Sequence, residues 1–288
     1  MSIIGADRDR ADAGAQTGWG RWLATPPGRY LLAWEQAQFD AVVADVFGFH
    51  AVQLGFGHLD ALAASRMRHR VRALDPQTWR SGAAEGIRGE WIEGDGPEGD
   101  GERRHALIVE RYEELPFADQ SIDLMVLPHL LEFAHAPHQV LREVNRVLRP
   151  EGRLIVSGFN PISLWGAREW VGAATSRHFL PVSGRFIGLP RLRDWFELLS
   201  LEIDASHYGC YRPPCRTEIW LERTRFLERA GDRWWPICGA AYFVSAVKRV
   251  PGMRLMGPAW KRDSGRRARV AVASPSFSPP GGERSGPR

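Results

Sequence analysis

Two glycines and one aspartate have the types and spacing of a nucleoside-binding site. Gly55 and Gly57 directly follow residues 51–54, a short apolar stretch that predicts a β-strand. Glycines at the end of a strand let backbone amides approach a ligand, because no Cβ stands in the way. Asp75 ends a second predicted strand twenty residues after Gly55, and a carboxylate there can accept hydrogen bonds from both ribose hydroxyls. The two glycines together with Asp75 favour a ligand that contains adenosine. The alternative is that Asp75 is only a turn residue before Pro76.

The elements that must position these residues alternate along the chain. Short apolar stretches predict strands at residues 51–54, 70–74, 105–110, 121–127, 153–158, 201–208 and 240–249. The stretches between them predict helices at residues 29–45, 59–67, 138–148, 190–199 and 217–230. Residues 160–190 are interpreted as an irregular excursion. Strands that alternate with helices predict a parallel sheet covered on both faces, with ligands beyond the carboxyl ends of its strands.

The composition is that of an ordinary globular protein. The chain has 288 residues, of which 44% are hydrophobic and 25% are charged. No apolar run approaches the roughly 18 residues that a membrane span needs. The N-terminus shows no secretory signal, so we expect a cytoplasmic protein. The three cysteines, Cys210, Cys215 and Cys238, are too few for a disulfide scaffold and lack the spacing of a zinc site, so no metal site is expected.

The excess of positive charge lies in one short segment. Residues 262–288 hold six arginines and two acidic residues, which accounts for the formal net charge of +4 of the whole chain. Residues 1–261 are therefore formally neutral, and no basic face for a nucleic acid is expected there. The Ser, Pro, Gly and Arg content of residues 262–288 predicts a disordered basic tail.

Three runs of sequence carry a resemblance to a known family. They are residues 114–123 (ELPFADQSID), 130–134 (LLEFA) and 140–154 (VLREVNRVLRPEGRL). In this order they resemble the class I S-adenosylmethionine-dependent methyltransferases, in the branch called methyltransferase type 11, over about residues 50–250. The resemblance implies an α/β, Rossmann-like fold with a seven-stranded, mostly parallel sheet, helices on both faces and an antiparallel last strand. It also implies transfer of a methyl group from the cofactor S-adenosyl-L-methionine.

The resemblance assigns residues to the cofactor site. The candidates are Gln53, Gly55, Phe56, Gly57, Asp75, Arg111, Tyr112, Glu113 and Pro128. The glycine loop corresponds to Gly55 and Gly57, and the ribose carboxylate to Asp75. Arg111 to Glu113 would flank the adenine, and Pro128 would lie beside the methionine portion and its sulfonium.

His129, which follows Pro128, is the candidate catalytic residue. It would act as a general base, which is needed only if the acceptor must lose a proton. The alternative is a structural histidine that caps the next helix.

Three positions depart from the family's pattern. Gln53 stands where an acidic residue is usual, Leu59 where a third glycine is common, and Arg111 where an aspartate often holds the adenine amine. An arginine side chain has no acceptor for that amine. Two functions therefore remain open: an active methyltransferase with a small-molecule acceptor, and a catalytically inactive domain that serves as a binding or scaffold protein. Residues 127–130 (LPHL) stand where a nucleic-acid methyltransferase would carry an Asn-Pro-Pro-aromatic tetrad, which disfavours that class.

The predicted organisation has four parts. They are a flexible N-terminus (1–18), an N-terminal helical segment (19–48), a methyltransferase-like α/β domain (49–261) and the disordered tail (262–288). Within the domain, residues 158–190 form a substrate-side excursion, whose aromatic and arginine side chains could receive an apolar or anionic molecule; the alternative is a cover packed on the sheet. Four tryptophans are interpreted as core residues, namely Trp19, Trp22, Trp234 and Trp235. These patterns name neither the methyl acceptor nor an oligomeric state.

Overall fold

The computed structural model describes residues 18–80, 103–175, 178–180 and 184–249. The predicted flexible N-terminus, apart from residue 18, and the predicted tail at 262–288 lie outside these ranges. Among the described residues, no helix is both long enough and apolar enough to cross a membrane.

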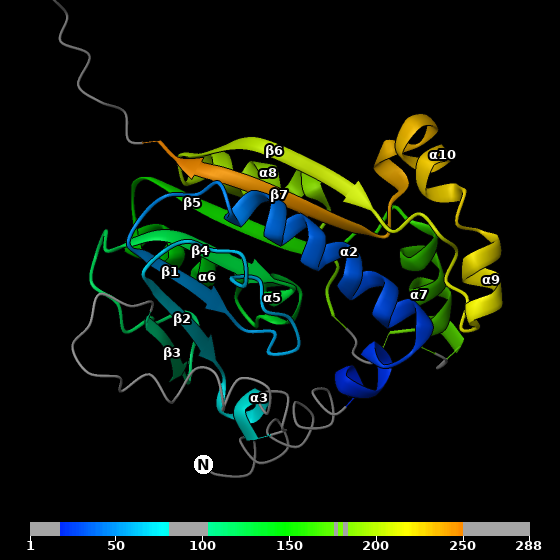
Figure 1. Cartoon of the computed structure of the whole chain (residues 1–288), viewed down its shortest axis with the longest axis horizontal. Coiled ribbons are helices and arrows are strands. Elements are labelled where there is room, and N and C mark those ends of the chain that lie inside the picture. Colours follow the sequence, from blue (N-terminus) through cyan, green and yellow to red (C-terminus); the bar gives the residue numbers. More distant parts are fainter. Residues whose placement is uncertain (1–17, 81–102, 176–177, 181–183, 250–288) are drawn as a thin grey trace, which may run out of the picture. The chain divides into compact units, whose positions relative to one another are not determined.

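Seven strands form one sheet in the order β3-β2-β1-β4-β5-β7-β6 (Figure 1). Their bounds are β1 (His50–Leu54), β2 (His69–Leu74), β3 (Arg103–Ile108), β4 (Ile122–Pro128), β5 (Leu148–Phe159), β6 (Leu201–Gly209) and β7 (Ala241–Lys248). The strands from β3 to β5 pair in parallel, whereas β7 lies antiparallel between β5 and β6. The predicted fold class, including the antiparallel last strand, is confirmed.

The helices lie on both faces of this sheet (Figure 1). Their bounds are α2 (Pro26–Val43), α3 (Pro76–Arg80), α5 (Leu130–Phe133), α6 (Pro137–Val147), α7 (Leu164–Thr175), α8 (Leu189–Leu198), α9 (Glu218–Arg223), α10 (Leu227–Trp234) and the 3-10 turn η1 (Pro236–Cys238). Proline occupies the first turn of α2, α6 and α8, where its missing N–H costs nothing. Residues 18–23 form a further helical turn ahead of α2.

Side chains alternate between two cores because successive residues of a strand point to opposite faces. On one face, Ala51 and Leu124 pack with Phe39 and Val43 of α2. On the other face, neighbouring strand residues pack with α6 and α8. These neighbours include Val52, Leu54, Met125, Leu127, Leu154 and Val156. The central strands are therefore buried on both sides, which explains their continuously apolar sequences.

The predicted helix at 59–67 is wrong, since the connection between β1 and β2 consists of turns. Buried polar side chains of the two strands bind its backbone. The Gln53 amide nitrogen donates to the Leu59 carbonyl at 2.7 Å, and the Gln53 oxygen accepts the Ala61 N–H at 2.9 Å. Arg72 donates to the Gly57 and Leu59 carbonyls at 3.0 and 2.8 Å. These side chains take the backbone groups that a helix would use for its own hydrogen bonds.

Two other helix predictions need correction. The excursion at 160–190, predicted to be irregular, contains α7, whose start is stabilised by the Ser163 hydroxyl accepting the Gly166 N–H at 3.0 Å. The single helix predicted at 217–230 is divided into α9 and α10. The division falls at Thr224, whose hydroxyl and N–H both donate to the Trp220 carbonyl, at 2.8 and 3.1 Å.

The isosteric change Gln53→Glu tests whether this side chain holds the β1–β2 connection. A carboxylate cannot donate to the Leu59 carbonyl, so two acceptors would face each other in a buried position. The free energy of unfolding should fall by about 1–3 kcal/mol in a denaturant titration. Gln139→Glu, at an exposed position of α6, is the matched control and should leave it nearly unchanged. Equal stability of the two variants would mean that Gln53 does not hold the connection.

Candidate functional site

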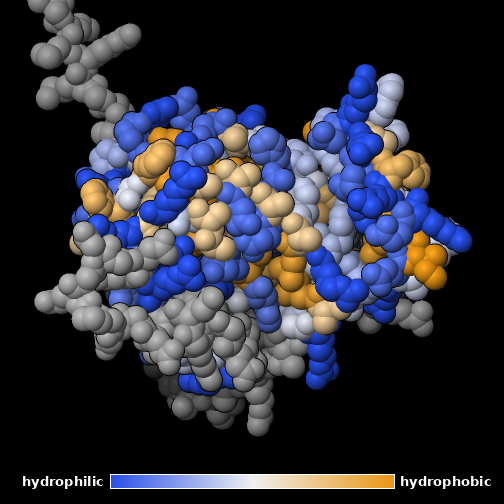
Figure 2. Space-filling view, viewed as in Figure 1, coloured by the Kyte–Doolittle hydropathy of each residue, from blue (hydrophilic) through white to orange (hydrophobic). Residues whose placement is uncertain are grey.

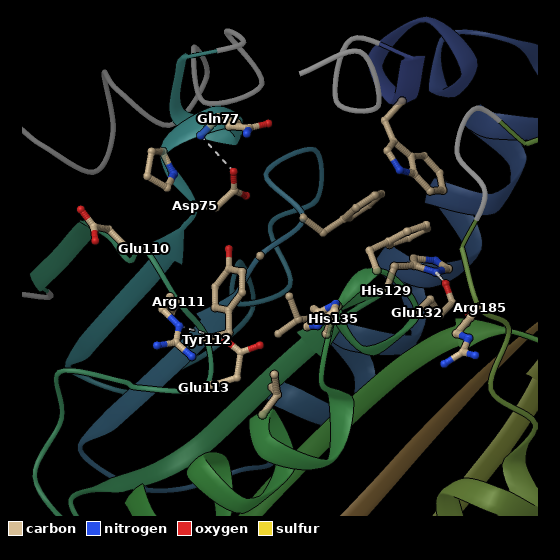
Figure 3. Close-up of a pocket in the computed structure, with 18 of the residues that line it drawn as sticks. Asp75, Gln77, Glu110, Arg111, Tyr112, Glu113, His129, Glu132, His135 and Arg185 are labelled. Atoms are coloured by element: carbon tan, nitrogen blue, oxygen red, sulfur yellow. Dashed lines mark hydrogen bonds and ion pairs between the residues drawn. The ribbon is translucent and has the colours of Figure 1, made fainter. Parts of the chain in front are cut away.

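A cavity of about 860 Å³ lies at the carboxyl ends of β1, β2 and β4 (Figure 3). The sheet order changes direction beside β1, which is flanked by β2 on one side and β4 on the other. Such a switch point is where parallel sheets bind ligands. Six of the nine predicted cofactor residues line the cavity, namely Gly55, Phe56, Asp75, Arg111, Tyr112 and Glu113. The other three, Gln53, Gly57 and Pro128, are not among its lining residues.

The backbone after β1 explains the glycine at position 55. Gly55 has φ +66°, in the left-handed region, and its N–H donates to the Ala73 carbonyl at 2.9 Å. A Cβ at Gly55 would lie 2.8 Å from Leu130 Cδ1 and 3.6 Å from the Tyr112 hydroxyl. A side chain at position 55 would therefore press on Leu130, and glycine leaves the backbone bare at the cavity wall.

Asp75 caps α3 from the end of β2. One carboxylate oxygen accepts the N–H groups of Gln77 and Thr78, both at 2.9 Å, and the other accepts the Thr78 hydroxyl. The turn role considered from sequence is thus present. A carboxylate has about four lone-pair sites, so these bonds leave acceptor capacity for a ligand. Asp75 also lines the cavity, and capping and ligand binding are compatible at this residue.

Tyr112 faces Asp75 across the cavity wall (Figure 3). Burial raises the pKa of the Tyr112 phenol well above its usual value, and the Asp75 carboxylate raises it further. Tyr112 is therefore a neutral hydroxyl at physiological pH, able to donate a hydrogen bond next to a carboxylate that accepts one.

Arg111 is a half-exposed neighbour of this pair. Its guanidinium lies 2.9 Å from Glu114 and 4.0 Å from Glu113, as an exposed ion pair at the cavity rim. The side chain thus interacts with the acidic residues that follow it in the sequence.

His129 lies at the base of the cavity, between two carboxylates. Its Nε2 is 2.9 Å from Glu35 Oε1, its Nδ1 is 2.9 Å from Glu132 Oε2, and the ring is fully buried. Glu132 also accepts the Phe159 N–H. Burial by itself would lower the pKa of His129, but the two carboxylates outweigh it and raise this pKa to about 10. Burial raises the pKa of Glu132, which its contact with the ring opposes. His129 precedes α5, yet its side chain makes no capping hydrogen bond.

Aromatic rings surround the His129 ring. The centroids of Phe159, Phe56 and Trp19 lie 4.4, 5.3 and 6.0 Å from the His129 centroid. Trp19, Phe56 and Phe133 also line the cavity, so its base is largely aromatic.

Sequence reasoning missed Glu35 and Trp19 as site residues. Trp19 was interpreted only as core; it is buried, but it also lines the cavity. Glu35 is fully buried in α2 between Leu31 and Phe39, each four residues away. A lone carboxylate at this spacing within an apolar helix face was a signal that could have found it.

The excursion after β5 contributes mainly to packing. Trp165 and Phe179 join a buried cluster with Trp22 and Leu31. The Asn160 amide donates to the carbonyls of Ile237 and Gly239 at 2.7 and 2.9 Å. Among the described residues of 160–190, Arg185 lines the cavity.

The chain resembles known proteins at the level of a domain. Residues 52–156 match the model of a family described as methyltransferase domain. An 89-residue stretch is 45% identical to the uncharacterized protein YafS of Escherichia coli, over 31% of this chain and 36% of YafS. The uncharacterized protein YafE of the same organism is 48% identical over 44 residues, 15% of this chain and 21% of YafE. The chain thus spans about a third, or less, of the length of these curated relatives.

Solved structures with the same fold cover more of the chain. A chain in a complex that contains the Haloferax volcanii Trm112 methyltransferase activator superposes with a TM-score of 0.55 at 17% identity, over 82% of this chain and 98% of that chain. A SAM-dependent methyltransferase from Thermotoga maritima has a TM-score of 0.49 at 18% identity, over 74% of this chain and 88% of that chain. Residues 52–156 are therefore similar to the methyltransferase domain family, and the seven-stranded, Rossmann-like sheet is the fold that this chain shares with the chain in the Trm112 complex.

Proposed function

We propose that this protein transfers a methyl group from S-adenosyl-L-methionine to a small-molecule acceptor. The observation that carries the proposal is the cavity at the switch point of the sheet, where the bare Gly55 backbone, the Asp75 carboxylate and the Tyr112 side chain come together. These groups suit an adenosine: a space without a Cβ, an acceptor for ribose hydroxyls and a neutral donor beside it.

Each of these residues has a role in the proposed complex. Asp75 would accept the ribose hydroxyls, while the backbone at Gly55 and Phe56 would approach the ligand closely. The aromatic rings of Trp19 and Phe133 would exclude water from the base of the cavity. S-adenosylmethionine, when bound, supplies a methyl group that its sulfonium already activates. The protein would therefore contribute mainly orientation and desolvation.

The family departures fit a site that has adapted around them. Gln53 binds its own loop, and Arg111 pairs with Glu114, so neither position is left as a gap. The alternative, a methyltransferase-fold protein that binds or scaffolds without catalysis, is separated from the proposal by cofactor binding and by methyl transfer.

For His129 we propose a positioning role. A protonated ring between two carboxylates has no free lone pair to accept a proton from an acceptor. The cation would instead hold Glu35 of α2 and Glu132 of α5 together beneath the cavity. The general-base role stays a prediction, and it requires the ring to lose a proton near neutral pH.

Asp75 variants test the cofactor site by titration calorimetry with S-adenosylmethionine. Asp75→Ala should lose about 1.5–3 kcal/mol of binding free energy, roughly tenfold to over a hundredfold in affinity, because a charged acceptor is removed. Thr78→Val is the control for capping, since it removes the hydroxyl that Asp75 accepts but keeps the carboxylate. It should bind the cofactor like the parent. If Asp75→Ala binds the cofactor as tightly as the parent, Asp75 serves only to cap α3. If the parent itself binds no cofactor, the proposed function is refuted.

His129→Gln tests the buried ion cluster through stability. Removal of the cation leaves two buried carboxylates, which should cost about 3–5 kcal/mol in the free energy of unfolding. The pKa of His129 is raised from 6.5 to about 10, so this contribution is complete below pH 6.5 and disappears as the pH rises through 10. The stability gap between parent and variant should therefore narrow from pH 6.5 to 10.

Two further variants complete this test. Glu35→Gln in the His129→Gln background removes one of the uncompensated carboxylates and should recover part of the loss. His178→Gln, which disrupts the more exposed pair with Glu169, should cost at most about 1 kcal/mol. If the stability difference between the parent and His129→Gln does not change with pH, the assignment of a buried imidazolium is contradicted.

A further inference from the structure

The segment between β6 and β7 carries large apolar side chains that face solvent. Six of them lie within residues 219–237: Ile219, Trp220, Phe226, Trp234, Trp235 and Ile237, with exposed fractions of 55–70%. The prediction from sequence that Trp234 and Trp235 are core residues is therefore wrong. Figure 2 shows hydrophobic side chains at the surface where Figure 1 places α9 and α10. We call residues 216–237 the Trp–Arg surface.

Arginines are interleaved with these apolar side chains. Five exposed arginines, at positions 216, 223, 225, 229 and 233, outnumber three exposed acidic residues, at 218, 222 and 232. The Arg223 guanidinium lies 5.5 Å from the centre of the Trp220 ring. Short helices with tryptophan, phenylalanine and arginine side by side are typical of segments that lie in a membrane interface.

The backbone of the Trp–Arg surface is fixed to the rest of the fold. Leu221 of α9 is buried, and Gly231 of α10 packs against the Tyr211 ring. The Tyr211 hydroxyl donates to the Pro236 carbonyl at 2.8 Å, and the Asn160 amide donates to the Ile237 carbonyl at 2.7 Å. The apolar side chains are therefore exposed on a segment whose backbone is packed and hydrogen-bonded to the rest of the fold.

The Trp–Arg surface lies at the same edge of the sheet as the cavity. The segment follows Gly209, the last residue of β6, and leads to β7. Ala241, the first residue of β7, pairs with Gly209 on one side and with Phe159 on the other, so these three residues lie at one edge of the sheet. Phe159 is in turn the last residue of β5, which runs parallel to β4 and ends at the edge where the cavity is formed. α9 also contacts α2, the helix that carries Glu35.

We propose that the Trp–Arg surface docks on the surface of an anionic lipid membrane. The guanidinium groups would lie at the level of the lipid phosphates, and the indole and phenyl rings would enter the boundary of the acyl chains. A protein partner is the other occupant that the test below must separate, because tryptophan, phenylalanine and arginine are also enriched at protein interfaces. If the methyl transfer proposed above takes place, docking would also bring the cavity edge to an acceptor dissolved in lipid.

Sedimentation of the full chain with vesicles tests this docking. The vesicles consist of phosphatidylcholine, with or without phosphatidylglycerol. The parent should bind the anionic vesicles, and Trp220→Ser/Trp234→Ser/Trp235→Ser should lower vesicle affinity about tenfold or more, because apolar burial is lost. The triple variant keeps every arginine, including those of residues 262–288, so the loss reports on the apolar side chains.

A matched pair of phenylalanines gives the internal control. Phe226→Ser should weaken vesicle binding, whereas Phe47→Ser should not. Phe47 is 82% exposed, but it precedes β1 and lies at the opposite edge of the sheet. Equal binding by these two variants would overturn the proposal. The proposal would also be overturned if the parent protein bound neither type of vesicle. The same holds if the parent formed dimers or bound RNA and the triple variant lost that property, since the surface would then have another occupant.

Calorimetry with S-adenosylmethionine on the same variants separates the two proposals. Cofactor affinity should be unchanged in the triple variant, which also shows that it is folded. A parent that binds anionic vesicles but no cofactor would refute the proposed methyl transfer and still support docking.

Discussion

A single imidazole ring joins helix α2 to the carboxyl edge of the sheet. His129 directly follows β4, and its ring contacts Glu35 of α2 and Glu132 of α5. Glu132 also accepts the N–H of Phe159, the last residue of β5. All three side chains are buried, so each charge depends on the others for its solvation. The cluster thus adds a buried polar link between α2 and the carboxyl edge of the sheet to the apolar packing of Phe39 and Val43.

Polar groups also shape the other side of the cavity. Gln53 and Arg72 reach out of the strands to bind the backbone of the β1–β2 connection, which consequently forms turns where the sequence predicted a helix. Asp75 combines the capping of α3 with a place in the cavity wall. In both cases polar side chains at a strand end organise the local backbone, and Asp75 also lines the cavity.

Segments distant in the sequence meet at the carboxyl edge of the sheet. The helical turn at 18–23 supplies Trp19, the segment after β5 supplies Arg185, and the connection between β6 and β7 adds α9 and α10 (Figure 1). The sheet itself is common to many chemistries, so what distinguishes this protein is the set of side chains gathered at that edge. The exposed tryptophans and arginines of residues 216–237 belong to this set.

The sequence by itself determined the sheet and much of the candidate cofactor site. Continuously apolar stretches predicted seven strands, because burial on both faces leaves a local signature. The antiparallel last strand was implied by the family resemblance of the runs at 114–123, 130–134 and 140–154. Gly55 and Asp75 could be found from the same strand pattern, because each directly follows the last residue of a predicted strand.

Only the tertiary structure decided which side chains act together. Glu35 reaches His129 from a helix 94 residues earlier, and no local pattern records such a contact. The burial of Trp19 and the exposure of Trp234 could not be told apart from residue type, because a tryptophan suits a core and an interface equally. Likewise, the hydrogen bonds of Gln53 and Arg72 outweighed the helical propensity of residues 59–67, and those bonds exist only once β1 and β2 are paired.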